Sequence, residues 1–262
     1  DRYEEIKEQY KDFAAKLDIQ DFNFIPISAL KGDNVVNRSE KMTWYDGPTL
    51  LYSLENIPVA NDINHLDFRL PVQTVIRPHS KEYHDYRAYA GQISSGIIRL
   101  GDEITVFPSQ LQSRIKKIHT AKTELKEAFA PQSVSIELTD DIDISRGDML
   151  VKTNNQPEHG QEIDAMICWM GNSPMNLNGK YLIKHTSREG RAIIKEIVYV
   201  MDLNSLKRIT EQNKLEMNGI ARIKLKTTIP LFFDPYRKNR STGSFILIDE
   251  SNFNTVGAGM II

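Results

Sequence analysis

The amino-acid sequence predicts a mainly β fold in which two antiparallel β-barrels follow a short α/β segment. Apolar and polar residues alternate with period two along residues 86–150, and the alternation is broken at residues 94–96 and 101–102, where glycine permits tight turns. The same pattern restarts at residue 161. Strands of this kind have one buried and one solvated face, and they can remove their exposed edges by closing into a barrel.

The composition is that of an ordinary globular protein. The chain has 262 residues, 40% hydrophobic and 26% charged, which is enough for two compact domains. Its longest apolar runs, such as residues 245–248, fall far short of the roughly 20 residues that cross a bilayer. A formal net charge of −2 argues against wholesale nucleic-acid binding. The single cysteine, Cys168, excludes an internal disulfide and fits a reducing cytoplasm.

The N-terminal segment predicts a helix followed by a strand and a loop of small residues. Apolar residues at steps of three and four indicate an amphipathic helix: Tyr3, Ile6, Tyr10, Phe13 and Leu17. Residues 22–27 have a β-like composition and lead into Ser28, Ala29 and Leu30. This order is typical of an α/β nucleotide-binding domain, although the chain contains no G-x-x-x-x-G-K-[ST] phosphate loop.

A short helix and a polar linker join this segment to the first barrel. Gly47 and Pro48 precede a leucine-rich stretch, and proline is tolerated in a first helical turn. Pro58 ends the helix, and residues 60–67 are a polar linker. The second boundary is expected in the polar, proline-bearing residues 154–157. We therefore expect an α/β segment at residues 1–60, a first barrel at 61–155 and a second barrel at 156–262.

Two groups of cationic residues are candidate contact surfaces. Arg114, Lys116 and Lys117 lie on a predicted strand of the first barrel, and Arg237, Lys238 and Arg240 lie in a turn of the second. Guanidinium groups suit the recognition of carboxylates and phosphates. A solvated surface and a contact with a partner both stay open for each group, and for the turn a contact with the nucleotide-binding domain stays open as well.

No group of residues has the spacing of a metal site. His79 and His84 lack cysteine or carboxylate partners at zinc-ligand spacing, so a surface loop is expected there. The acidic run from Asp140 to Asp143 lacks the glycine and the terminal glutamate of a calcium-binding loop, so an acidic turn is expected. No nucleophile has an adjacent base, and the sequence predicts no catalytic residues.

Several motifs carry a resemblance to elongation-factor-like GTPases. Gly91, Ser95-Gly96, the Leu100-Gly101-Asp102 turn and residues 145–150 resemble the second domain of these proteins. Ser28-Ala29-Leu30 is similar to their last guanine-recognition motif. Further stretches resemble the large subunit of bacterial sulfate adenylyltransferase: residues 46–51, 54–55, 68–73, 75–78, 234–236, 239–240, 242–249 and 255–261.

This resemblance implies that the chain is the C-terminal part of a GTP-hydrolysing subunit that binds GTP and Mg²⁺, and that this stretch itself holds no cofactor. It implies that main-chain N–H groups of Ser28, Ala29 and Leu30 are a remnant of the guanine site. In that family a separate small subunit makes adenosine 5′-phosphosulfate from ATP and sulfate in the cytoplasm, and it is the implied partner. The alternatives are the barrels of a translational GTPase, which would bind tRNA or the ribosome, and a β-barrel interaction module with no link to GTP.

Overall fold

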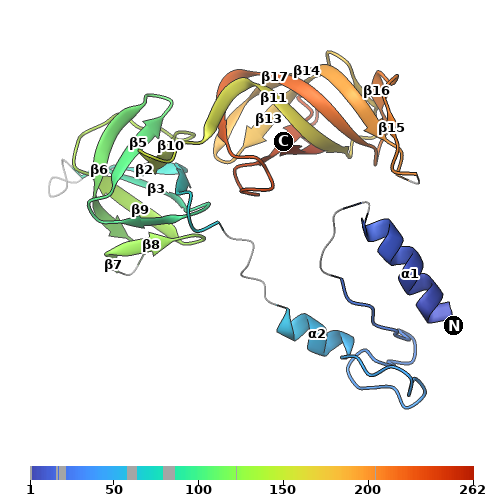
Figure 1. The fold of residues 1–262 in the computed structure, drawn as a ribbon. Helices are drawn as coiled ribbons and strands as arrows, with labels where there is room; N and C mark the ends of the chain where they lie inside the picture. The colour runs from blue at the N-terminus through green and yellow to red at the C-terminus, as the bar shows by residue number, and fades with distance from the viewer. Residues whose placement is uncertain are drawn as a thin grey trace. The chain divides into compact units, whose positions relative to one another are not determined.

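The computed structural model describes residues 2–15, 17, 22–57, 64–78, 86–121, 123–203 and 205–262 (Figure 1). The chain divides into two compact units, Asp1–Asp62 and Ile63–Ile262. The described helices lie in the first unit and the described strands lie in the second. The prediction of a mainly β protein is therefore confirmed.

Aromatic contacts hold the first unit together. Helix α1 (Arg2–Ala15) has acidic residues in its first turn, where their charges are favourable beside the positive end of the helix dipole. The Tyr3 ring lies 5.0 Å from the Trp44 ring, and the Tyr10 ring lies 5.6 Å from the Phe24 ring. Helix α2 (Leu50–Asn56) begins at Thr49, whose hydroxyl accepts a hydrogen bond from the Tyr52 N–H. Both predicted helices are confirmed.

The prediction of a strand at residues 22–27 is wrong. These residues form no strand, and no other strand lies beside them in the described part of the first unit. A β-like composition is not sufficient, because a strand needs a neighbour that takes its backbone hydrogen bonds. Phe22 and Phe24 pack instead against the Tyr10 ring on α1.

The first sheet of the second unit is antiparallel, and its strand order is β1-β10-β5-β6-β9-β3-β2. Its strands are β1 (Arg69–Pro71), β2 (Thr74–Ile76), β3 (Ala88–Gln92), β5 (Glu103–Phe107), β6 (Leu111–His119), β9 (Ser133–Leu138) and β10 (Met149–Lys152). Strand β7 (Glu124–Leu125) pairs with β6, and β4 (Ile97–Arg99) pairs separately with β8 (Glu127–Phe129).

Strands β1 and β2 lie at opposite ends of this order although only Val72 and Gln73 separate them in the chain. The Val72 N–H donates to the Asp148 carbonyl beside β10, and the Gln73 N–H donates to the Ala90 carbonyl in β3, both at 2.8 Å. One continuous segment therefore serves both ends of the sheet, and no ladder of described residues joins β1 to β2.

The second sheet closes on itself, so the predicted barrel is confirmed there. The described strands form the ring β13-β18-β19-β11-β17-β14, which the pairing of β14 with β13 completes. Its members are β11 (Glu158–Trp169), β13 (Lys180–His185), β14 (Arg188–Met201), β17 (Ile220–Phe233), β18 (Ser244–Ile248) and β19 (Thr255–Ile261). Strand β15 (Arg208–Ile209) pairs antiparallel with β14, and β12 (Met175–Asn176) pairs with β16 (Lys214–Leu215).

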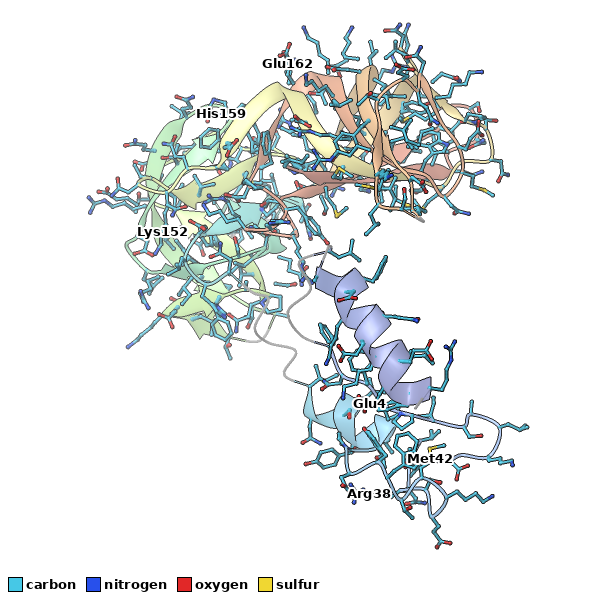
Figure 2. The ribbon with its side chains drawn as sticks, turned by 45° about the vertical axis from the view of Figure 1, so that its right-hand side comes forward. Glu4, Arg38, Met42, Lys152, His159 and Glu162 are labelled. Atoms are coloured by element: carbon cyan, nitrogen blue, oxygen red, sulfur yellow. The ribbon has the colours of Figure 1, made fainter. Side chains whose placement is uncertain are left out.

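Each sheet encloses its own apolar core, and a third apolar cluster lies between the sheets. Phe107, Met149 and Val151 of the first sheet contact Phe232 of the second, and each of these side chains is at most 2% exposed. The connection between the sheets runs from the end of β10 to the start of β11, and Figure 2 labels Lys152 on β10 and His159 on β11. Burying a side chain of this size contributes about 1.5–3 kcal/mol, so the two sheets share a stable interface.

Candidate partner-binding surface

The loop at Ser28, Ala29 and Leu30 has one engaged main-chain donor, because the Ser28 N–H donates to the Asp33 carbonyl at 3.1 Å. The Ser28 carbonyl accepts from the Gly32 N–H at 2.8 Å, which closes a tight turn. The Ala29 and Leu30 N–H groups have no acceptor among the residues that the structure describes, and the Leu30 side chain is 94% exposed. Free N–H groups on a turn can donate to a carbonyl-type oxygen of a ligand.

A β-bulge on β6 places two consecutive lysines on its outer side, where Lys116 is exposed and Lys117 is half-buried. Ile115 pairs with Leu138 and Lys117 pairs with Glu137, so Lys116 is the extra residue and the inside–outside alternation shifts there. Arg114, on the same outer face, forms an ion pair with Glu103. The three predicted cations of this strand therefore lie together on the solvated face of the first sheet, where the side chain of Arg114 is 62% exposed.

The turn between β17 and β18 brings the other three predicted cations together. Arg237, Lys238 and Arg240 are all exposed, whereas Asn239 between them is only 5% exposed. The Asn239 carboxamide oxygen accepts from the N–H groups of Ser241 and Thr242. This side chain therefore fixes the turn from inside and leaves the cations on its outer surface.

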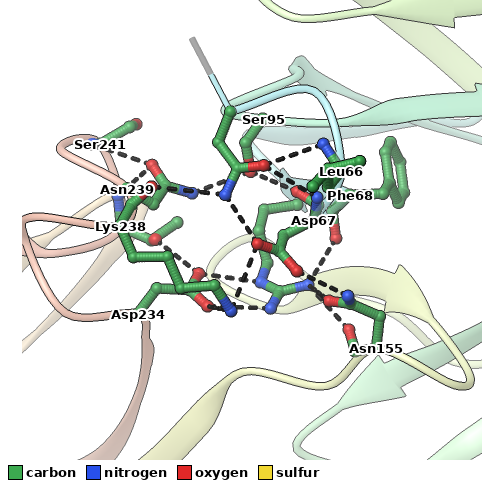
Figure 3. Close-up of polar contacts among 12 residues, drawn as sticks. Leu66, Asp67, Phe68, Ser95, Asn155, Asp234, Lys238, Asn239 and Ser241 are labelled. Atoms are coloured by element: carbon green, nitrogen blue, oxygen red, sulfur yellow. Dashed lines mark hydrogen bonds and ion pairs between the residues drawn. The ribbon is translucent and has the colours of Figure 1, made fainter. Parts of the chain in front are cut away.

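A buried polar network behind this turn joins the two sheets, and the sequence reasoning missed it (Figure 3). Arg69 of β1 is 0% exposed, and its guanidinium donates to both carboxylate oxygens of Asp234 at 2.9 Å. Its remaining nitrogen donates to the Phe68 carbonyl and to the Asn155 carbonyl and carboxamide oxygens at 2.8–3.0 Å. Every nitrogen of the guanidinium thus has an acceptor, as a buried charge requires.

A second ion pair completes the network. The Lys238 ammonium lies 3.2 Å from the Asp67 carboxylate and 3.8 Å from that of Asp234. Burial works to raise the pKa of Asp67, but hydrogen bonds from Asn64, Asn155 and Lys238 outweigh it and hold the pKa below its ordinary value. The sequence did contain a signal, because Arg69 and Asp234 both adjoin apolar runs in which a charge must find an opposite charge.

His185 adds a pH dependence to this junction. Its ring is 1% exposed and lies 2.7 Å from the Thr242 carbonyl, and burial lowers its pKa. The unfolded chain therefore takes up a proton at a higher pH than the folded protein does, so the free energy of unfolding should fall as the pH drops below about 6.5. We expect a loss of about 1 kcal/mol between pH 8 and pH 5.5. Urea unfolding should show this loss for the unaltered chain, and His185→Gln should abolish it.

No group of histidine, cysteine or carboxylate side chains among the described residues could hold a metal ion. His79 and His84 lie outside the described residues. Asp140 accepts from Ser113 and Thr139, and Asp141 forms an ion pair with Arg87. No described helix is long and apolar enough to span a membrane.

The fold has known counterparts. The family described as GTP-eEF1A C-terminal domain-like matches residues 162–262. The crystal structure of sup35 complexed with GMPPNP matches with a TM-score of 0.69 and 18% identity, over 100% of this chain and 64% of that one. The translation elongation factor SelB from Methanococcus maripaludis matches with a TM-score of 0.62 and 16% identity, over 81% of this chain and 46% of that one. At these identities the likeness shows the fold alone.

Closer relatives match along the whole chain. It is 47% identical to the bifunctional enzyme CysN/CysC of Mycobacterium tuberculosis, over 100% of this chain and 43% of that protein. It is 45% identical to sulfate adenylyltransferase subunit 1 of Bacteroides thetaiotaomicron, over 100% of this chain and 55% of that protein. The chain thus spans about half the length of these relatives. The predicted resemblance is confirmed: over its full length, this chain is a homologue of sulfate adenylyltransferase subunit 1.

Proposed function

We propose that this chain works in sulfate activation, as part of the subunit of sulfate adenylyltransferase that couples GTP hydrolysis to the formation of adenosine 5′-phosphosulfate from ATP and sulfate. The observation that carries the proposal is the 45% identity to subunit 1 of Bacteroides thetaiotaomicron along all of this chain. In this role the protein is cytoplasmic and heteromeric, and its partner is the small catalytic subunit that performs the adenylyl transfer.

Within that enzyme the 262 residues would transmit the nucleotide state of the GTPase to the small subunit, and they would not themselves catalyse a reaction. The sequence has no phosphate loop, so we propose that GTP and Mg²⁺ are held by residues outside this chain. Ser28, Ala29 and Leu30 would contribute only the contact to the guanine base. We further propose three domains: the end of the nucleotide-binding domain at residues 1–60, a first barrel at 61–155 and a second barrel at 156–262.

A translational role is the competing proposal, since SelB and sup35 share the fold. Tight tRNA binding needs clustered cations that contact many phosphates. Arg114 on β6 is already paired with Glu103, and Lys238 is paired with Asp67. Contact with a protein partner therefore agrees better with the described surface than contact with nucleic acid.

The chain should bind the small catalytic subunit of its own organism and should not bind tRNA tightly. Isothermal titration calorimetry with each ligand measures both affinities under the same conditions. Saturable binding of the subunit, retained in the presence of excess tRNA, supports the sulfate role. Tight and salt-sensitive tRNA binding, with no affinity for the subunit, would replace it with the translational one.

A further inference from the structure

We propose that Asn34 is a positioning residue for the guanine contact. Its buried side chain holds the loop of residues 28–33 so that the N–H groups of Ala29 and Leu30 can donate to the 6-oxo group of the base. This inference rests on the proposed function and deepens it, because it names a residue that sets the specificity of that contact. It is argued from the contacts of Asn34, the closure of the loop and the attachment of the loop to α2.

The Asn34 side chain is buried and engaged although it stands in a polar stretch. It is 2% exposed, and its backbone has φ +56°, a left-handed conformation that asparagine adopts more readily than most residues. Its amide nitrogen donates to the Pro26 carbonyl at 2.9 Å and lies 3.3 Å from the Met42 sulfur. Its amide oxygen accepts from the Ser39 N–H at 2.8 Å. One side chain therefore joins the segment before the loop to the segment after it.

Both ends of the loop are fixed beside this side chain. The Ser28 N–H donates to the Asp33 carbonyl at 3.1 Å, so the two ends of the loop meet. Asn34 follows Asp33 directly and binds the carbonyl of Pro26 just before the loop begins. The N–H groups at the tip, residues 29–30, have no acceptor among the residues that the structure describes. The anchored ends thus hold two donors that have no partner within the described structure.

The backbone after the loop attaches it to helix α2. The Asn34 carbonyl accepts from the N–H of Leu50, the first residue of the helix, at 3.0 Å. The Val35 carbonyl accepts from the Leu51 N–H at 2.9 Å. The loop is therefore held against a regular element, and its donors keep their direction before a ligand binds. Groups that are fixed in advance lose little conformational entropy on binding.

Two fixed N–H donors select the chemistry of the group that they meet. The 6-oxo group of guanine is an acceptor, whereas the 6-amino group of adenine is a donor and leaves the N–H groups without a hydrogen bond. The side chain of Leu30 is 94% exposed, so it does not pack over the tip of the loop. A loop that presents donors alone favours guanine as long as these donors do not turn away, and Asn34 prevents them from turning.

The inference is tested by a thermodynamic cycle between Asn34 and the 6-oxo group. Calorimetry compares GDP with the diphosphate of 2-aminopurine riboside, which has no 6-oxo group, in the full-length subunit that carries these residues. Asn34→Gly removes the side-chain hydrogen bonds and tolerates the left-handed φ. It should lower the preference for GDP about fivefold or more. A purely structural role would weaken both ligands equally and leave their ratio unchanged.

The matched control makes the same change at a different asparagine. Asn37 is exposed and lies close to Asn34 in the chain, so Asn37→Gly alters the same stretch without removing the buried side chain. The preference of Asn37→Gly for GDP should equal that of the unaltered subunit.

A second variant and a second measurement cover the case in which Asn34→Gly is unstable. Asn34→Asp keeps an acceptor for the Ser39 N–H but replaces the donor to Pro26 with a carboxylate oxygen, which repels that carbonyl. It should lower the same preference several-fold. In the chain of 262 residues, either change at Asn34 should accelerate hydrogen exchange at the Ser28 N–H, because its bond to Asp33 opens more often. Asn37→Gly should leave this exchange rate as it is.

The outcomes separate this inference from the proposed function. If the unaltered subunit prefers GDP and both Asn34 variants keep that preference, Asn34 does not position the loop, and the sulfate role still stands. Equal losses of preference in Asn34→Gly and Asn37→Gly would also overturn the inference. Unchanged exchange at Ser28 in both Asn34 variants would contradict the anchoring of the loop. An unaltered subunit that binds no guanine nucleotide would contradict the proposed function itself, and with it the role of Asn34.

Discussion

Replacing Arg69 with methionine should lower the free energy of unfolding of the second unit by about 3–5 kcal/mol. The change removes the guanidinium that neutralises the carboxylate of Asp234, a residue that is only 2% exposed. The carboxylate would keep the Thr242 hydroxyl at 2.9 Å and the Lys238 ammonium at 3.8 Å, which do not replace two charge-assisted hydrogen bonds. Urea unfolding followed by the fluorescence of Trp169, which lies in the core of the second sheet, measures the loss.

Two further variants show whether the buried charge is the cause. Arg69→Met/Asp234→Leu should be more stable than Arg69→Met alone, because the double change leaves no unpaired charge at this pair. Arg114→Met removes an ion pair whose two side chains are more than half exposed, and it should cost less than about 1 kcal/mol. Equal losses in Arg69→Met and Arg114→Met would contradict a special role for the buried pair.

Replacing Gly96 with alanine should destabilise the protein by about 3 kcal/mol or more, or prevent folding. Gly96 has φ +77°, and a Cβ atom there would lie 2.4 Å from the backbone nitrogen and Cα of Phe68. Phe68 is fully buried, and the Gly96 N–H donates to the Asn64 carbonyl at 2.6 Å. The backbones at Gly96 and Phe68 cannot separate without disturbing the packing of Phe68 or the hydrogen bond to Asn64, which belongs to the polar network.

Gly101 provides the matched control for this substitution. It has a similar φ of +81°, but no atom lies within 4 Å of the position that a Cβ would take. Gly101→Ala should therefore cost only the strain of the left-handed conformation, about 1–2 kcal/mol. Thermal unfolding of both variants compares the two costs. A Gly96→Ala variant as stable as Gly101→Ala would show that the close approach to Phe68 is not what requires glycine there.

The candidate surface could be predicted only in part. The exposure of Arg237 and Arg240 agrees with their position in a polar turn before a glycine, which is information that lies within ten residues of sequence. The ammonium of Lys238 reaches Asp67 on the far side of the junction. Nothing in the local sequence indicates this ion pair, which depends on the packing of the second sheet against the first.

The sequence by itself determined the features that depend on near neighbours. Period-two alternation predicted the strands, and the left-handed conformation of Gly96 and Gly101 agrees with turns that glycine permits. Local composition failed at residues 22–27, because a strand exists only when a neighbour accepts its hydrogen bonds. Local pattern also could not decide which sheet closes, since closure depends on how β13 meets both β14 and β18.

Only the tertiary structure decided where charge is buried. Arg69 and Asp234 stand 165 residues apart, and nothing in either local sequence names the other as its partner. A buried charge is stable only if an opposite charge and further hydrogen bonds reach it, and the two sheets supply these from separate parts of the chain. The fold therefore joins Asn64, Asp67 and the turn at residues 234–243 into one network that no local pattern contains.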